Sequence, residues 1–405
     1  MKKLKYIILP ILAGIIFVYG FNKYLDEKNT SLLKNRSLYT MLHDTKSLVK
    51  DKGVFANNYL TKNGYIMVMG SSELSHSTKQ HPDYYFDTGR TKHGVITIGR
   101  AYTQTLQHAT ILGSTDSNIK NKRVVLLLSM QWFMERKGVR EHRFMTRFSP
   151  IQFYRYLDNP KLSRELKIKF AKRVGYMLNK KPGEFKPEAL YAKLYVKNDP
   201  LSNIAKFLLK PYYFMRESMV SLKDKGITLH YLESCYPKNE VDYNIKGKID
   251  WKKERKEAIE DAKLRVGTVP EYLGGHRLYL DKGYYKEYIK GRDKYFKNVY
   301  GYVKLLKTRE YEDFDIFLET CKEMGVKPTI VLLPTNNDFY NYTGMSEKSR
   351  AIYRNHIKNI IKPYGFRVID LHKESKEKYY LRDVMHLGTL GWVDLCQKLY
   401  NIYEK

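Results

Sequence analysis

Five short apolar runs, each followed by a cluster of polar residues, constrain the fold of this chain more than any other feature. The runs are rich in Val, Ile and Leu and cover residues 65–69, 95–98, 124–128, 329–333 and 367–371. Such runs, without regular polar alternation, are typical of parallel strands buried on both faces. Helical patterns lie between several of them, at residues 101–112, 314–324 and 346–361. The sequence therefore predicts an α/β fold with a parallel sheet.

The polar residues that follow these runs are expected to meet at one edge of the sheet, because parallel strands all point the same way. Ser71 and Ser72 follow the first run directly after Gly70. Taken alone, that stretch is better explained by a turn with a serine helix cap. Asp383 and His386 follow the last run, at a spacing that lets the carboxylate orient the imidazole. Together they supply the nucleophile, base and orienting group of acyl transfer.

Two other strand ends offer hydrogen-bond donors for the oxyanion of such a reaction. Gly99 ends the second strand, and without a side chain its backbone N–H is open to a ligand. Asn336 follows the fourth strand and carries an amide donor. Donors aimed at a developing oxyanion commonly supply the larger part of catalysis. The alternatives are a turn glycine and an asparagine that is bonded within its own loop.

The amino terminus predicts a membrane anchor over residues 1–24. Lysines at positions 2, 3 and 5 precede residues 6–21, which carry no charge and are nearly all apolar. A cleaved signal peptide is the alternative, but small residues at A-x-A spacing do not follow the run. The preceding lysines favour a cytoplasmic amino terminus, so the rest of the chain is expected outside the membrane. Residues 25–53 look like a polar, helical stalk.

The charge of the chain indicates a polyanionic partner. It has 73 Lys+Arg against 43 Asp+Glu, a formal net charge of +30. For an outward-facing, tethered protein, that partner is a cell-envelope polymer or a lipid headgroup rather than nucleic acid. Only Cys235, Cys321 and Cys396 occur, without metal-ligand spacing. Neither a disulfide framework nor a zinc site is indicated, and no cofactor is expected.

Residues 140–312, dense in Lys, Arg and Tyr, are predicted to form a largely helical insertion between the third and fourth strands. Helical segments are expected at residues 160–179, 204–223 and 251–266, and a terminal helix at 390–400. Residues 203–222 are apolar around much of a helix circumference. A core helix is the favoured interpretation; a helix that lies on a membrane or a partner is the alternative.

Ser, Gly, Asn and His on successive strand ends, with Asp three residues before the His, resemble the SGNH (GDSL-like) hydrolase superfamily. The wording MGSSEL at 69–74, SMQWF at 129–133, PTNNDFYNYTG at 334–344 and DVMHLG at 383–388 is similar to the DltD family of teichoic acid D-alanyltransferases. This resemblance covers essentially the whole chain. It implies a three-layer α/β/α SGNH-like catalytic domain over residues 54–405, with the insertion and an N-terminal transmembrane helix.

The resemblance also assigns roles. The superfamily's Gly-Asp-Ser box falls on Gly70-Ser71-Ser72, so Ser72 is the implied nucleophile, and Ser71 is the alternative because it replaces the usual Asp. His386 is the implied base and Asp383 its orienting partner. The Ser72 N–H, Gly99 and Asn336 are the implied oxyanion donors. Gln131 and Trp132 are expected to line the acyl or acceptor pocket.

The implied activity is esterification of lipoteichoic acid with D-alanine outside the membrane, through a serine acyl-enzyme and with a DltB-type membrane acyltransferase as partner. One alternative is an esterase or O-acetyltransferase that acts on another cell-wall polymer. Another is a non-catalytic scaffold that binds teichoic acid. The implied location is the cell membrane of a Gram-positive bacterium, with a single pass.

Overall fold

The computed structural model of this chain describes residues 2–35, 47–75, 78–86, 88–179, 183–234, 247–268 and 271–405. Its centre is a five-stranded parallel sheet in the order β2-β1-β3-β6-β7. The strands are β1 (Ile66–Met69), β2 (Val95–Ile98), β3 (Arg123–Leu128), β6 (Thr329–Leu332) and β7 (Arg367–Asp370). Each of the five apolar runs contains one strand, and the predicted α/β fold with a parallel sheet is confirmed.

The register of the sheet brings the strand ends level. Met69 of β1 pairs with Ile98 of β2 and with Leu126 of β3. The polar residues after β1 and β2 therefore start side by side. Four strands, including the edge strand β2, are buried almost throughout, as expected, whereas β7 at the other edge is partly exposed.

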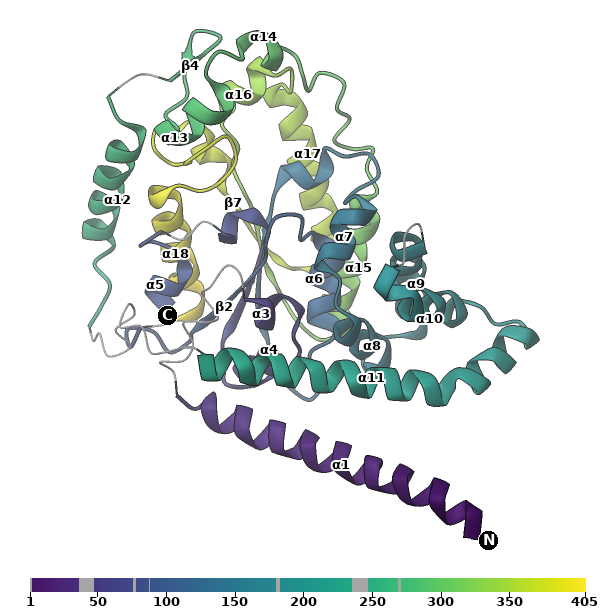
Figure 1. The fold of residues 1–405 in the computed structure, drawn as a ribbon. Helices are drawn as coiled ribbons and strands as arrows, with labels where there is room; N and C mark the ends of the chain where they lie inside the picture. The colour runs from purple at the N-terminus through teal and green to yellow at the C-terminus, as the bar shows by residue number, and fades with distance from the viewer. Residues whose placement is uncertain are drawn as a thin grey trace.

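Helices cover both faces of the sheet (Figure 1). Alternate strand residues contribute to two separate cores, as the two-residue period of a strand requires. One core contains residues of α6 (Thr105–Gly113), α8 (Pro150–Asp158), α9 (Arg164–Asn179), α15 (Glu310–Glu323) and α17 (Glu347–Ile361). The other contains residues of α5 (Pro82–Phe86), α12 (Trp251–Val266) and α18 (Thr389–Tyr403).

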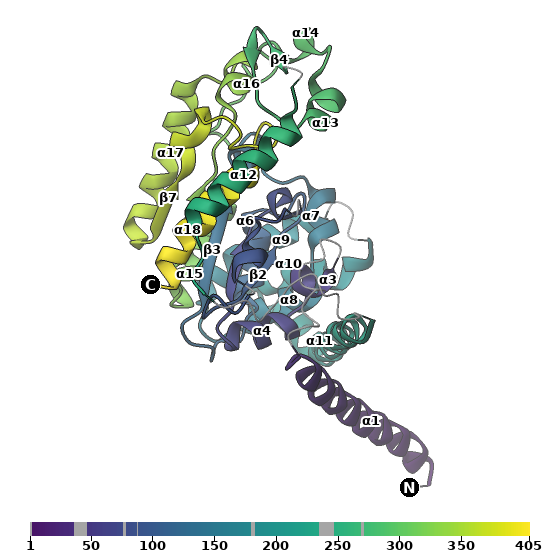
Figure 2. The ribbon, with the colours of Figure 1, turned by 90° about the vertical axis from the view of Figure 1, so that its left-hand side faces the viewer.

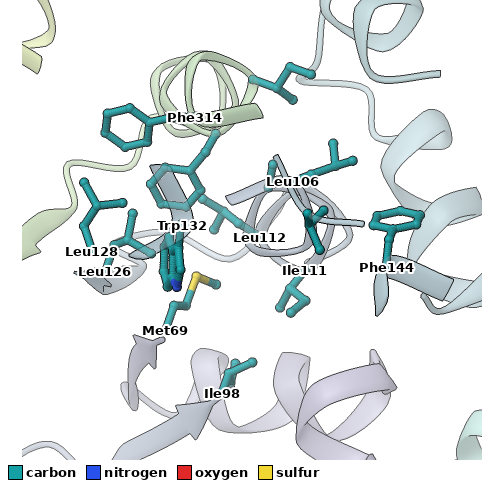
Figure 3. Close-up of a cluster of buried hydrophobic side chains, with 14 of the residues drawn as sticks. Met69, Ile98, Leu106, Ile111, Leu112, Leu126, Leu128, Trp132, Phe144 and Phe314 are labelled. Carbon is teal, nitrogen blue, oxygen red and sulfur yellow. The ribbon is translucent and has the colours of Figure 1, made fainter. Parts of the chain in front are cut away.

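The first core lies directly under the strand ends. Figure 3 shows the side chains of Met69 and Leu128, at the ends of β1 and β3, in a cluster with Trp132. Leu106 of α6 and Phe314 of α15 belong to the same core. This packing fixes the ends of β1 and β3, and with them the segments that follow.

The segment between β3 and β6 is largely helical, as predicted. It also contains a small two-stranded hairpin, β4 (Tyr272–Leu273) and β5 (His276–Arg277), which the sequence patterns did not indicate. Its remaining elements are η3 (Met130–Phe133), α7 (Glu141–Arg147), η4 (Gly183–Phe185), α10 (Lys186–Val196), α11 (Pro200–Ser234), α13 (Lys282–Tyr284), η5 (Tyr285–Ile289) and α14 (Asp293–Phe296). After β6 come α16 (Asn337–Tyr342), η6 (Lys362–Tyr364) and η7 (Leu371–Lys376).

The chain begins with a long helix, α1 (Lys2–Leu32), whose amino-terminal end lies away from the sheet (Figures 1 and 2). The carboxyl-terminal part of α1 packs on α11: Asn29 Nδ2 donates to the Lys225 carbonyl at 2.9 Å, and Lys225 Nζ lies 2.6 Å from Asp26 Oδ1. Within the described part of the chain, no helix is both apolar enough and long enough to traverse a bilayer. The predicted anchor therefore stays a prediction.

Two short helices, α3 (Leu48–Lys52) and α4 (Phe55–Lys62), precede β1. Residues 36–46 of the predicted stalk lie outside the described residues. Val49, Lys50 and Asp51 are buried, and Lys50 Nζ donates to Thr97 Oγ1 of β2 at 3.3 Å. The end of the predicted stalk thus packs against the sheet.

The prediction that residues 203–222 form a core helix is wrong for much of its surface. They lie within α11, which buries one side, including Tyr213 and Val220. The other side exposes large apolar side chains, such as Phe207 and Phe214. Apolar residues around much of the helix circumference did not predict burial, because only one side of α11 packs against the rest of the described chain.

Candidate active site

Ser72 stands at the carboxyl end of β1, as the first residue of a short 3-10 turn, η2 (Ser72–Ser75). Gly70 and Gly99 lie back to back beside it. A Cβ on Gly99 would come within 2.2 Å of the Gly70 carbonyl oxygen, so only glycine allows the end of β2 to approach this turn so closely. The turn is therefore shaped by backbone packing between two strand ends.

Ser71 and Ser72 have different hydrogen-bond partners in the structure. Ser72 Oγ lies 2.8 Å from Nε2 of His386. Ser71 Oγ instead donates to the carbonyl of Arg100 at 3.1 Å, and Ser71 is buried. Of the two candidates, Ser72 is the one in hydrogen-bond contact with the imidazole.

Asp383 holds His386 from the far side of the ring. Oδ2 of Asp383 lies 2.7 Å from Nδ1 of His386. Its other oxygen, Oδ1, accepts the backbone N–H groups of Met385 at 2.9 Å and His386 at 2.8 Å. The Asp383 carboxylate therefore stabilises the turn that contains it and orients the His386 ring. This is the arrangement expected from the three-residue spacing.

The charges of this pair stabilise each other. Burial acts to lower the pKa of His386, but the carboxylate of Asp383 outweighs it and raises that pKa above its usual 6.5. Burial acts to raise the pKa of Asp383, but His386 and the loop N–H groups lower it below 3.8. Asp383 is thus held as a carboxylate that favours a proton on the imidazole.

Glu73 places a second carboxylate under the turn. Its Oε1 accepts the backbone N–H of Ser71 at 2.8 Å, and its side chain is buried. Burial raises the pKa of Glu73 above 4.5, while His386 and the Ser71 N–H oppose the rise. Glu73 therefore fixes the backbone just before Ser72 and adds to the field at His386.

Ser72 opens on a cavity of about 860 Å³. The cavity is lined by residues that follow β1, β2 and β3, and by residues 300–307 of the insertion. Five of its lining side chains are basic: Arg136, Arg140, Arg143, Lys304 and Lys307. We call these five residues the basic wall. Arg143 lies 4.0 Å from the centre of the Tyr102 ring, a cation–π contact on the cavity lining.

Gln131 and Trp132 line this cavity, as predicted for the substrate pocket. Trp132 is nevertheless buried, and its ring centroid lies 5.5 Å from that of His108. Gln131 is only partly buried. Of the two, Gln131 presents its side chain to the cavity more openly, while Trp132 mainly belongs to the core beneath it.

The two predicted oxyanion donors already have other partners. The Gly99 N–H donates to Oδ1 of Asp51 at 3.1 Å. The Asn336 amide donates to the Leu278 carbonyl at 3.0 Å, and its oxygen caps α16 by accepting the Phe339 N–H. Asn336 also lines a different cavity from Ser72. Their oxyanion role stays a prediction that requires both groups to change partner.

Two residues that position the site, Asp51 and His108, were not anticipated from the sequence. Asp51 was assigned to the stalk, yet it accepts the Gly99 N–H and lies 2.5 Å from Nε of Arg100. His108 Nε2 lies 2.8 Å from the Gly70 carbonyl, and burial lowers the pKa of His108 to about 4. A neutral imidazole therefore donates to the turn. A lone histidine in a helical pattern carries no signal for such a role.

The basic wall was also missed, although its spacing was visible. Arg136, Arg140 and Arg143 lie within eight residues of one another, shortly after the third apolar run.

In the described part of the chain, no group of three or more His, Cys, Asp or Glu side chains is arranged to hold a metal ion.

Comparisons with known proteins agree with one another. The sequence model of a family described as DltD protein matches residues 43–404. Protein DltD of Bacillus subtilis (strain 168) is 28% identical over 385 residues, which cover 95% of this chain and 90% of the relative. Protein DltD of Staphylococcus aureus is 23% identical over 96% of this chain and 94% of its own length. Protein DltD of Lacticaseibacillus rhamnosus is 23% identical over 85% of this chain and 79% of the relative. The family match spans most of the chain, so this chain belongs to the DltD family.

Proposed function

We propose that this chain is an SGNH-type serine acyltransferase that esterifies (lipo)teichoic acid with D-alanine on the outer side of the cell membrane. The observation that carries the proposal is the contact of Ser72 with His386, itself held by Asp383, at the mouth of a cavity with a basic wall. Membership of the DltD family supports the choice of acyl group and acceptor.

In the acylation step, Ser72 Oγ attacks the carbonyl carbon of an activated D-alanyl group while its proton passes to Nε2 of His386. The imidazolium that forms is stabilised by Asp383, which lies on Nδ1. When the tetrahedral intermediate collapses, the donor's leaving group takes that proton and departs. The product is a D-alanyl ester on Ser72 and a neutral His386.

In the second step, a hydroxyl of the teichoic acid chain attacks this ester. His386 removes the hydroxyl proton and returns it to Ser72 Oγ as the new ester leaves, so the enzyme regains its starting state. Transfer to a polymer rather than to water requires that the acceptor fill the cavity. The Ser72 N–H, at the start of η2, has no partner in the described part of the chain and supports an oxyanion role.

The basic wall gives the acceptor a binding surface. Arg and Lys side chains bind phosphate oxygens by charge and by hydrogen bonds, and guanidinium groups do so in pairs. A poly(glycerol phosphate) chain repeats one negative charge per unit, so several wall residues can bind successive phosphates. Gln131 at the cavity would then meet the acyl group or the attacking glycerol.

We further propose that residues 1–24, which begin the chain and most of which lie in α1, are the membrane anchor and that a DltB-type membrane acyltransferase is the partner that supplies the acyl group. The sequence supports the anchor through its uncharged run at residues 6–21 behind a lysine cluster. Apolar side chains of α1, such as Ile16 and Phe17, are exposed to solvent and fit a lipid environment better than water.

The test compares Ser72→Ala with Ser71→Ala in full-length protein and in cells. Intact-mass spectrometry with an activated D-alanyl donor should detect a D-alanyl adduct on the wild type and on Ser71→Ala, but not on Ser72→Ala. Cellular D-alanine ester content should collapse for Ser72→Ala alone. An unchanged ester content in Ser72→Ala would favour a non-catalytic teichoic acid scaffold.

The same protein separates the proposal from an esterase or O-acetyltransferase that acts on another wall polymer. It would be incubated in parallel with D-alanylated lipoteichoic acid and with an O-acetylated polymer. Turnover of the D-alanyl ester with little turnover of the acetyl ester is the expected result. The reverse preference would contradict D-alanyl transfer while leaving the serine chemistry intact.

A further inference from the structure

An apolar stripe runs along the amino-terminal two-thirds of α11 and has no cover in the described part of the chain. Seven of its side chains are from 56% to 78% exposed: Leu201, Ile204, Phe207, Leu208, Phe214, Met215 and Met219. Tyr212 lies among them and is 43% exposed. We call these eight residues the α11 stripe. So many large apolar side chains on one helix would be unusual for a surface that meets only water.

The helical period explains why the stripe is not part of the core. At 3.6 residues per turn, positions 201, 204, 208, 212, 215 and 219 share one side of α11. Phe207 and Phe214 lie on the adjacent side, which is also exposed. The buried residues Tyr213, Val220 and Asp224 fall on another side, which packs against the domain. α11 is therefore apolar on two sides, and the domain uses only one of them.

The stripe lies on the side of the molecule where α1 leaves it. In Figure 1, α11 runs across one end of the domain and α1 lies beyond it, on the side away from the sheet. Figure 2 also shows α1 extending past α11, away from the domain. Because the buried side of α11 faces the domain, the stripe faces outward, as do exposed apolar residues of α1 such as Ile15 and Phe17.

Basic residues beside the α11 stripe indicate what kind of surface covers it. Lys193 and Lys197, on α10 and at its end, and Lys210 on α11 are exposed beside this half of the helix. The chain carries a formal net charge of +30. A second copy would bring the same charge and be repelled, whereas an anionic lipid surface offers both hydrocarbon and negative headgroups.

We propose that α11 lies in the interface of an anionic bilayer, with the α11 stripe inserted among the acyl chains. In such a helix the apolar face sits about 5–10 Å into the boundary between headgroups and acyl chains. The domain would then rest on the membrane through α11, in addition to any attachment through α1. This contact fixes the orientation of the domain, which a single helical tether does not.

Tryptophan quenching by lipid tests the position of α11 directly. Phe207→Trp would be reconstituted as the full chain in vesicles of phosphatidylglycerol and phosphatidylcholine brominated on its acyl chains. Leu264→Trp on α12 is the matched control, because Leu264 is 76% exposed and Phe207 is 77% exposed. The signal of the three native tryptophans is subtracted with the wild-type protein.

The proposal expects strong quenching and a blue-shifted emission for Phe207→Trp, and little of either for Leu264→Trp. Equal and weak quenching at both positions would overturn it. An emission shift that depends on protein concentration, without quenching by lipid, would also overturn it and would indicate a second copy on the stripe. Phe214→Trp provides a second position on the same stripe, and the melting temperature of each variant checks its fold. None of these readouts depends on acyl transfer.

Discussion

The carboxylate of Asp51 accepts the backbone N–H of Gly99 at 3.1 Å and lies 2.5 Å from Nε of Arg100. The Arg100 carbonyl in turn accepts the hydroxyl of Ser71, next to Ser72. A residue that precedes the sheet thus supports the strand end against which the Ser72 turn packs. Asp51 is a positioning residue, and its effect on chemistry would act through the backbone.

We expect Asp51→Ala to destabilise the protein by about 3 kcal/mol, because it leaves the partly buried Arg100 guanidinium and the buried Gly99 N–H without their carboxylate. Chemical denaturation of the full chain measures the change. Asp261→Ala is the control, since Asp261 pairs with Arg265 on the exposed surface of α12. That substitution should cost about 0.5 kcal/mol or less. Equal losses in the two variants would contradict the role given to Asp51.

The acid limb of the pH–rate profile should lie above pH 6.5. The base must be neutral to accept the Ser72 proton. Burial acts to lower the pKa of His386, but the carboxylate of Asp383 outweighs burial and raises that pKa. Activity should therefore fall as pH drops through that raised pKa. Asp383→Asn removes the carboxylate, so the limb should move to lower pH and kcat should fall, by about 10⁴-fold if the loss resembles that in serine proteases. A profile whose acid limb does not move would show that Asp383 does not determine the pKa of the His386 imidazole.

Glu73→Gln should shift the same limb in the same direction but by less. Glu73 raises the pKa of His386, although it acts less strongly than Asp383. The amide oxygen of the glutamine can still accept the Ser71 N–H, so the turn should keep its shape. Glu135→Gln is the control, because Glu135 lines the same cavity at its exposed side. A limb that moves equally in both variants would indicate a general field effect of the cavity.

Replacing residues of the basic wall should weaken binding of the acceptor and leave the rate of the acyl chemistry unchanged. We expect Arg136→Ala and Lys307→Ala each to raise KM for lipoteichoic acid by about tenfold, the loss of one charged hydrogen bond. Hydrolysis of a small uncharged ester should be unchanged. Lys252→Ala on the exposed surface of α12 should change neither rate. A loss of small-ester hydrolysis in the wall variants would place these residues in the chemical step.

The sheet was predictable because strands buried on both faces need continuous apolar residues, and five such runs are present. The meeting of Ser72, Asp383 and His386 followed from the parallel direction of these strands. The choice between Ser71 and Ser72 did not, because it depends on the Arg100 carbonyl that binds Ser71.

The remaining differences have local causes. Asn336 looked like a free donor at a strand end, but the start of α16 and the Leu278 carbonyl use both ends of its amide. Gly99 looked open, but Asp51 binds it from a segment whose sequence resembles a polar stalk. Apolar content could not tell burial from exposure in α11, because either side of that helix could have met the domain.

The order of strands in the sheet has a consequence for how the protein matures. β3 and β6 are neighbours, yet roughly 200 residues separate them in the chain, and Ser72 and His386 are 314 residues apart. Long-range pairing of this kind closes late, because the intervening chain must first be ordered. If the chain is exported from its amino terminus, Ser72 emerges early, and His386, the base of the proposed mechanism, emerges almost last. Under the proposed mechanism, a partly exported chain would therefore be inactive, and acyl transfer would begin only when β7 and the Asp383–His386 loop have docked.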